Sequence, residues 1–169
     1  VMSVGATYDA NVGSRTWPLT PPSTGTCTDS TTMADLIVCS SNRASNLDIL
    51  APGAIITSTN LGGGMLGTGG TSNAAPHVAG VAALLSQANN NLLPSQIENM
   101  LKNSNVIVND NVSGLSFPRV DAVDSINSLP TLTLVGSPRM GTTAYFNLSA
   151  PLDSNTGYII ALAGSNSPG

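Results

Sequence analysis

The most constraining feature of the chain is a glycine-dense loop that runs into an apolar helix pattern with a serine at its start. The loop, Asn60 to Gly70, can adopt backbone conformations that are closed to other residues. From Ser72 onward apolar residues fall nearly all round the helix, which predicts a buried helix. These residues are Ala74, Ala75, Val78, Ala79, Val81, Ala82, Leu84 and Leu85. Pro76 falls in the first turn or so, where proline harms the hydrogen-bond ladder least.

The position of Ser72 at this helix start has two interpretations. Serine is among the best N-cap residues, so Ser72 could simply cap the helix. Alternatively, the unpaired N–H groups of a first turn favour negative charge, and a serine that attacks a carbonyl would have its own N–H placed to stabilise the oxyanion. Gly69 and Gly70 would then let a substrate backbone approach closely. The residues around Ser72 leave both interpretations open.

Composition and charge narrow the classes of protein. Hydrophobic residues make up 41% of the 169 residues and charged residues only 8%, a balance more typical of exported than of cytosolic proteins. The net charge of −4 argues against nucleic acid as a partner, because phosphate binding needs clustered Lys and Arg. The longest apolar-rich stretch, Val78 to Leu85, is far shorter than the ~20 residues that span a bilayer.

The two cysteines, Cys27 and Cys39, lie close enough in sequence to close a short loop. A disulfide between them would suit an oxidising compartment and a secreted protein, whereas the alternative is a pair of unpaired buried thiols.

The sequence predicts two regions with different secondary-structure patterns, with a boundary at Pro130. Residues 1–129 mix strands, loops and helices, with Asp9 to Thr32 as a long surface loop. The expected strands are Val1–Thr7, Leu36–Cys39, Leu47–Leu50 and Ala54–Thr57, and the further expected helices are Pro94–Ser104 and Val120–Leu129. Residues 130–169 alternate in the manner of β-strands and predict the start of a truncated all-β, sandwich-like module, in which Tyr145, Phe146 and Tyr158 are core residues.

Four stretches of the chain resemble one protein family. Gly70 to Gly80, GTSNAAPHVAG, resembles the GTSMA-x-PHVAG signature of the subtilases, the subtilisin-like serine proteases of peptidase family S8, with Asn73 in place of Met. VMSVGAT resembles the family's VIAVGA strand, SSNRASNLDILAPGAIITST its FSN…D-x-x-APG-x-x-I-x-ST stretch, and PRVDAVDSI its closing helix. The matches run in the family's order from Val1 to about Leu129.

The resemblance implies a fold and a set of site residues. The fold would be a partial three-layer α/β domain with a mostly parallel sheet, comprising the C-terminal part of a catalytic domain. Ser72 would be the nucleophile and would contribute its N–H to the oxyanion hole, with support from Thr71. Asn73 should make the enzyme more tolerant of peroxide than the family's Met does.

Some of the catalytic groups implied by the resemblance lie outside this chain. The Asp and His of the triad and the Asn of the oxyanion hole belong upstream of Val1, so we expect the chain alone to be inactive and to require that upstream part. His77 does not replace the base, since five helical residues place it ~140° round and ~7.5 Å along from Ser72. We expect it to be a structural histidine. Structural calcium is possible through Asp48, although a solvated loop aspartate is the alternative, and no metal ligand set or other cofactor is identifiable.

Two functions remain as hypotheses. The first is an extracellular endopeptidase that hydrolyses protein or peptide substrates through an acyl-enzyme on Ser72. The second is a catalytically dead subtilase fold used for binding or assembly. Because a partial sheet leaves an open edge and an uncovered face, we also expect the isolated chain to be poorly soluble.

Overall fold

The computed structural model describes residues 1–19, 21–135 and 145–149. It divides the chain into two compact units, Val1–Leu129 and Pro130–Gly169. The boundary coincides with the change of secondary-structure pattern in the sequence at Pro130. The assignment of the two units to a catalytic domain and a β module stays a prediction.

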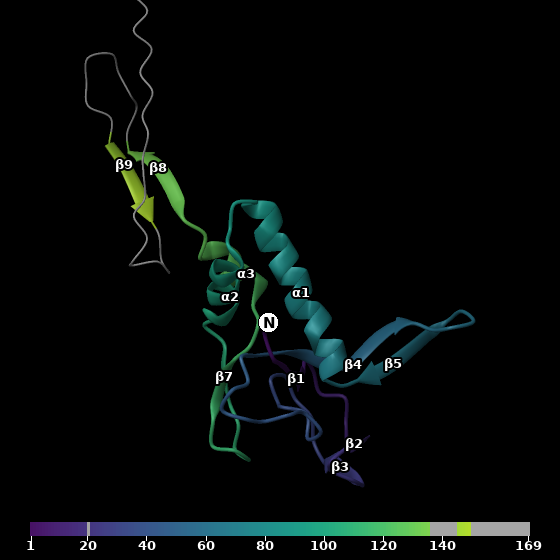
Figure 1. Ribbon diagram of the computed structural model, residues 1–169. Helices are drawn as coiled ribbons and strands as arrows, with labels where there is room; N and C mark the ends of the chain where they lie inside the picture. The colour runs from purple at the N-terminus through teal and green to yellow at the C-terminus, as the bar shows by residue number, and fades with distance from the viewer. Residues whose placement is uncertain (20, 136–144, 150–169) are drawn as a thin grey trace, which may run out of the picture. The chain divides into compact units, whose positions relative to one another are not determined.

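A three-stranded sheet forms the centre of the first unit (Figure 1). β1 (Val4–Tyr8) pairs in parallel with β4 (Ile49–Thr59), and β4 turns back into the antiparallel β5 (Met65–Gly69). The sheet is therefore mixed, with one parallel and one antiparallel pairing among its described strands. Met65–Gly69 lies in the segment expected to be only a loop, and the two predicted strands Leu47–Leu50 and Ala54–Thr57 are parts of one long strand.

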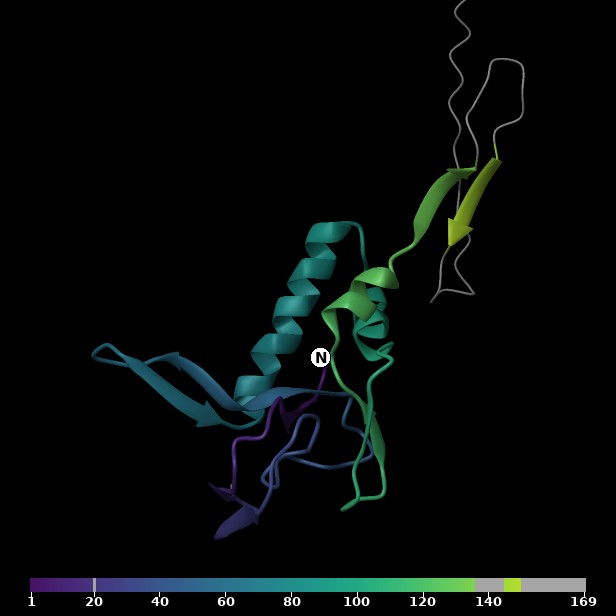
Figure 2. The same cartoon turned by 180° about the vertical axis from the view of Figure 1, so that it is seen from behind.

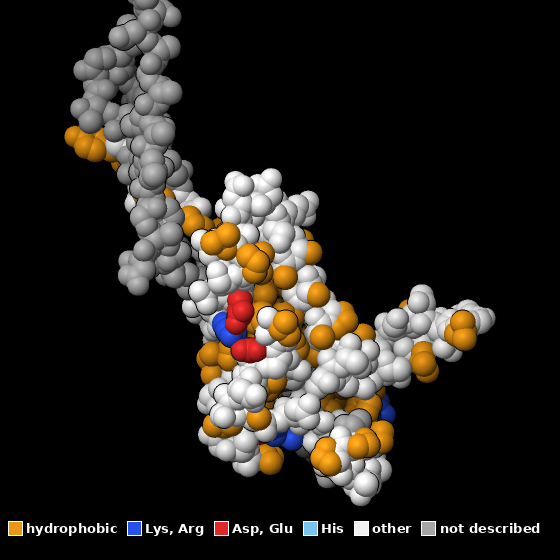
Figure 3. Space-filling model, in the orientation of Figure 1, with side chains coloured by type: hydrophobic (Ala, Val, Ile, Leu, Met, Phe, Trp, Pro, Cys, Tyr) orange, Lys and Arg blue, Asp and Glu red, His pale blue; other side chains and the backbone are white. Residues whose placement is uncertain are grey.

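The helix α1 (Thr71–Ala88) follows β5 directly and packs on β4 and β1 (Figure 2). Its buried residues are Ala74, Val78 and Leu85, which lie on one face. The expectation of a helix buried all round is therefore wrong for this structure, because the described residues cover α1 on one side. Figure 3 shows hydrophobic side chains exposed along α1 and at the β4–β5 hairpin tip, where Leu61, Met65 and Leu66 lie.

Two shorter helices pack beside α1, and both have clear start signals. α2 (Pro94–Lys102) has proline in its first turn, and the Gln96 side chain accepts a hydrogen bond from the Leu93 N–H at 2.8 Å. α3 (Ala122–Asn127) is capped by Asp121, whose carboxylate accepts from the N–H groups of Val123 and Asp124. Both helices are a few residues shorter than the predicted ones.

Two hairpins, neither predicted, complete the unit. β2 (Arg15–Pro18) pairs with β3 (Thr26–Asp29) inside the segment that we expected to be a loop. β6 (Ile107–Asn109) pairs with β7 (Ser116–Pro118). Leu36–Cys39, in contrast, forms no strand and only bridges to β1 through Thr7 and Ile37.

The β6–β7 hairpin closes a small hydrophobic core under β4. Leu50 of β4 packs there with Ile37, Val108 and Phe117, all of them buried. An ion pair next to this core joins Arg43 Nε to the Asp110 carboxylate at 3.0 Å, with the Asp110 side chain only 4% exposed. The loop that carries Arg43 is thereby tied to the turn of the hairpin.

In the second unit, β8 (Thr131–Val135) pairs with β9 (Tyr145–Ser149) in an antiparallel ladder. The Tyr145 side chain is exposed, so its assignment to a core is wrong for the described structure. The Phe146 side chain and Tyr158 lie outside the described residues.

Candidate active site

Ser72 lies in the first turn of α1 with its side chain exposed. The N-cap residue is Gly70, and no side chain caps the helix. The first interpretation of Ser72, a simple N-cap serine, therefore does not hold in the structure. Within the described part of the chain the Ser72 hydroxyl forms no hydrogen bond.

The backbone that leads into Ser72 is fixed by two glycines in close contact. The Gly70 N–H donates to the Gly53 carbonyl at 2.8 Å, which ties the end of β5 to β4. A Cβ on Gly53 would lie 2.9 Å from the Gly70 oxygen, and Gly70 itself has a φ of +145° that side chains rarely adopt. Neither position therefore accepts a side chain without moving the turn that carries Ser72.

The first turn of α1 has N–H groups free to receive a negative charge. The Gly70 carbonyl accepts from the N–H groups of Asn73 and Ala74 at 3.0 and 3.3 Å. The Ser72 N–H has no backbone acceptor among the described residues. An unpaired N–H beside an exposed hydroxyl, at the positive end of a helix dipole, can stabilise an oxyanion that forms on a group attacked by that hydroxyl.

Asn73, which stands in place of the family's Met, has a defined partner. Its side-chain amide donates to the Thr68 hydroxyl at 3.0 Å and so links α1 to β5. Thr71, the residue that opens α1, is half-buried beside it. The supporting role of Thr71 stays a prediction.

His77 lies one turn further along α1 and points its ring back to the helix backbone. Its Nδ1 donates to the Asn73 carbonyl at 2.9 Å. The ring is exposed, whereas we expected a histidine packed around the helix. Because its bond goes to Asn73 and it makes no hydrogen bond with Ser72 in the described structure, His77 is not placed as a base for Ser72.

A disulfide joins Cys27 of β3 to Cys39. Close to it, Asp29 accepts hydrogen bonds from the Cys39 N–H at 3.0 Å and the Tyr8 hydroxyl at 2.8 Å. Burial, together with the neighbouring Asp29 carboxylate, raises the pKa of Tyr8 to about 12, against the opposing effect of the bond from Trp17. The Tyr8 phenol therefore stays neutral and keeps its proton for Asp29.

Asp48 serves as a structural anchor. Its Oδ2 accepts from the N–H and hydroxyl of Ser3, and its Oδ1 lies 2.7 Å from the Lys102 ammonium. These bonds, first that of Lys102 and then that of the Ser3 N–H, lower the pKa of Asp48 to about 2. Both Asp48 oxygens are therefore bonded within the fold, and the described residues contain no cluster of three or more acidic, His or Cys side chains that could hold a metal.

The fold and this helix start define an α/β protein of the subtilisin type. A model of the subtilase family, peptidase family S8, matches residues 1–130. The chain therefore belongs to the subtilase family.

Named relatives of the chain are proteases. It is 46% identical over 78 residues to alkaline serine exoprotease A of Vibrio alginolyticus, covering 46% of this chain and 15% of the relative. It is 50% identical over 64 residues to alkaline elastase YaB of Bacillus sp. strain YaB, covering 38% of this chain and 17% of the relative. The chain thus spans less than a fifth of the length of these two relatives.

Solved structures show the same fold. A protease from Pseudoalteromonas arctica PAMC 21717 superposes with a TM-score of 0.50 and 32% identity, covering 55% of this chain and 32% of that one. The patellamide maturation protease PatA superposes with a TM-score of 0.51 at 24% identity, covering 75% and 42%, and supports the fold alone. Among the helices that the structure describes, none has the length and apolarity to cross a bilayer.

Two residues that pack against the turn before Ser72 were not predicted from the sequence: Gly53, next to Gly70, and Trp17, next to Gly69. Gly53 lies inside β4, and a glycine inside a strand is a signal of close backbone approach that could have indicated its role. Trp17 lay in the expected loop. It is the only tryptophan of the chain, and a large aromatic residue in a Pro- and Thr-rich segment is a signal of packing that the loop prediction passed over.

Proposed function

We propose that this chain carries the nucleophile of a secreted serine endopeptidase of the subtilase family, with Ser72 as that nucleophile. The observation that carries the proposal is the exposed Ser72 hydroxyl, unpaired in the described structure, beside its own free N–H at the start of α1. Family membership and the protease relatives support the same reaction class. The disulfide and the low content of charged residues support an extracellular location.

The chemistry follows from these groups. Ser72 Oγ attacks the carbonyl carbon of a peptide bond, the C–N bond breaks, and an acyl-enzyme ester forms on Oγ. The negative charge that develops on the carbonyl oxygen is stabilised by the Ser72 N–H, whose direction is fixed by the Gly70–Gly53 hydrogen bond. The Oγ proton passes to a base and then to the leaving amine, and water later hydrolyses the ester.

The base must be a group other than those described here. His77 is bonded to Asn73, and no other histidine exists in the chain. The resemblance to subtilases assigns the base and its aspartate to residues upstream of Val1. We therefore propose that the 169-residue chain alone is inactive and that these upstream residues complete the site.

A fluorophosphonate probe applied to the natural full-length protein tests the proposal. We expect covalent labelling at Ser72, which is lost in Ser72→Ala and retained in Ser86→Ala, a matched exposed serine on the same helix whose hydroxyl bonds to the Ala82 carbonyl. The isolated chain should label at background rate. Absence of labelling in a folded full-length protein would contradict the proposal and favour a catalytically dead binding or assembly module.

A further inference from the structure

The β2–β3 hairpin places its tryptophan against the strand that leads to Ser72. Trp17 of β2 lies opposite Cys27 of β3. A Cβ built on Gly69 would lie within 3.0 Å of three carbon atoms of the Trp17 ring, all of them on the outer edge of its six-membered ring. The indole therefore packs directly on the Gly69 backbone, three residues before Ser72.

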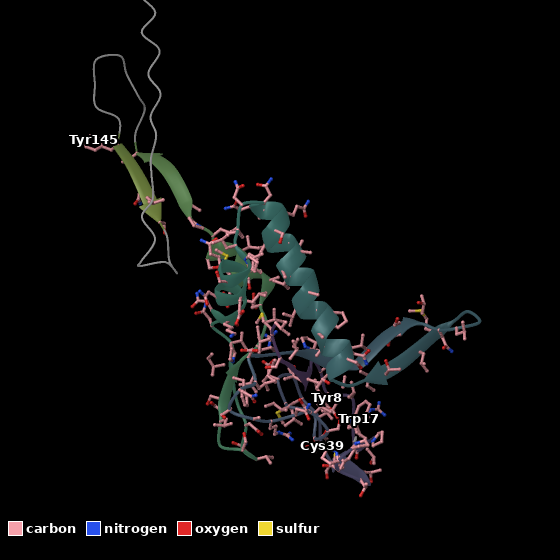
Figure 4. All side chains as sticks on the ribbon, viewed as in Figure 1. Tyr8, Trp17, Cys39 and Tyr145 are labelled. Carbon is pink, nitrogen blue, oxygen red and sulfur yellow. A yellow bond between two sulfur atoms is a disulfide. The ribbon has the colours of Figure 1, made fainter. Side chains whose placement is uncertain are left out.

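The opposite edge of the indole is held by hydrogen bonds. Trp17 Nε1 donates to the Tyr8 hydroxyl at 2.7 Å, and this hydroxyl donates to Asp29 at 2.8 Å. Tyr8 is fully buried in β1, and Asp29 also accepts from the N–H of the disulfide-bonded Cys39. Figure 4 shows Tyr8, Trp17 and Cys39 gathered below the start of α1. The ring thus has a fixed direction, set from the central sheet and from the disulfide-tied hairpin.

The segment from Gly69 to Ser72 is otherwise held by hydrogen bonds, of its backbone and of the Asn73 side chain to Thr68. Gly69 pairs with Ala54 at the end of the sheet, and Gly70 bonds to Gly53. Glycines at 69 and 70 have no side chains of their own to lock the turn. Trp17 supplies the bulk that Gly69 lacks, because the edge of its ring fills the space where a Cβ would lie.

We propose that Trp17 is a positioning residue for Ser72, an inference that rests on the proposed function. The indole holds Gly69 in place, and through Gly69 it holds the turn into α1. In this position the Ser72 hydroxyl and N–H can both reach the same carbonyl group of a substrate. Displacement of a reacting group by about 1 Å can lower a rate ~100-fold. Loss of this contact therefore lowers the rate of the chemical step more than it lowers the affinity for substrate.

Compensating substitutions in the natural full-length protein test this role. Trp17→Phe removes the outer ring atoms that touch Gly69 and should lower kcat and the labelling rate at Ser72 by about 10-fold, with KM within about twofold. Gly69→Ala drives a Cβ into the ring and should lower both by at least about 10-fold. In the double variant the new Cβ enters the space left by the ring, so its rate should be no lower than that of Trp17→Phe alone.

A second glycine in the same strand is the matched control. A Cβ on Gly67 would meet the Ile55 side chain and not Trp17. Gly67→Ala should therefore combine additively with Trp17→Phe. If Trp17→Phe folds poorly by circular dichroism, Tyr8→Phe replaces it, because loss of the hydroxyl frees the indole to move, and it should likewise reduce the loss caused by Gly69→Ala.

The outcomes separate this inference from the proposed function. If the wild type labels at Ser72 and the losses from Trp17→Phe and Gly69→Ala simply multiply, or Trp17→Phe labels as fast as the wild type, the positioning role is wrong and the nucleophile stands. If the folded wild type does not label, the proposed function and the positioning role fail together.

Discussion

Replacement of Asp110 by Asn should destabilise the protein strongly through the buried ion pair with Arg43. The two side chains are 4% and 15% exposed, and removal of one partner of such a pair typically costs about 3–5 kcal/mol, since the other charge stays buried. Arg43 keeps hydrogen bonds to the carbonyls of Ile37, Val38 and Cys39, which places the expected loss at about 3 kcal/mol. For a protein of 150–250 residues this corresponds to a fall in Tm of roughly 6–12 °C, and the fall is smaller in a longer chain.

The effect of Asp110→Asn should depend on pH with a defined sign. Burial tends to raise the pKa of Asp110, but hydrogen bonds from Ser113 and Val112 and the charge of Arg43 outweigh it, so that the pKa is lowered. The stabilisation is then complete above the unfolded pKa of about 3.9 and is lost as the pH falls through the lower folded value. The gap in Tm between wild type and variant should be full at pH 6 and should narrow in acid below about pH 3.

Thermal melts of the full-length protein in a Ser72→Ala background, which prevents self-digestion, measure both effects. Asp35→Asn is the matched control, because the Asp35 side chain is 41% exposed in its ion pair with Arg119 and such a pair contributes under about 1 kcal/mol. Its positive φ of 64° is also one that Asn tolerates. A Tm for Asp110→Asn within 1 °C of the wild type, or a gap that widens in acid, would refute the reasoning.

Three further predictions concern single interactions. Asp48→Asn should remove the stabilisation that accompanies the lowered pKa of Asp48, so that the unfolding free energy falls at pH 6 and the difference from the wild type shrinks as the pH falls through about 2; an equal difference at pH 6 and at pH 2 would contradict this. Loss of the Cys27–Cys39 disulfide in the double serine variant should cost about 3 kcal/mol in a denaturant titration, from the loop entropy of a separation of 12 residues; unchanged stability would count against it. Asn73→Met should make activity sensitive to peroxide, with inactivation that parallels the appearance of methionine sulfoxide by mass spectrometry, whereas the wild type keeps its activity; equal resistance of both proteins would oppose the assignment.

The sequence allowed the start of α1 to be predicted from a strong local signal, whereas the fold class was predicted from the resemblance to subtilases. A run of small apolar residues after a glycine loop specifies where α1 begins, whatever packs on it later. The helix was nevertheless expected to be buried on every side, and only Ala74, Val78 and Leu85 are buried. Periodicity reports which faces can be covered, not which neighbours cover them, and the described residues cover one face.

The hairpins were missed for a different reason. Pro, Gly, Ser and Thr dominate residues 9–32, and this composition predicts a loop, yet Thr16 and Thr28 bond across the β2–β3 ladder and a disulfide closes the segment. The contact of Trp17 with Gly69 joins positions 52 residues apart, and no local pattern contains information about such a pair. The site residues that a motif could not reveal are therefore the ones that act through tertiary packing.

No side chain caps the start of α1, so a group that binds there can form the hydrogen bond that a capping side chain would otherwise make. A serine, aspartate or threonine N-cap stabilises a helix by roughly a few tenths of a kcal/mol relative to glycine, and α1 lacks this contribution because Gly70 has no side chain. A tetrahedral adduct on Ser72 would supply such a stabilising contact by bringing an oxyanion to the free Ser72 N–H. Adduct formation should thus stabilise the amino-terminal turn of α1 against local opening. Slower amide hydrogen exchange at residues 72–74 in the inhibited protein would show this stabilisation.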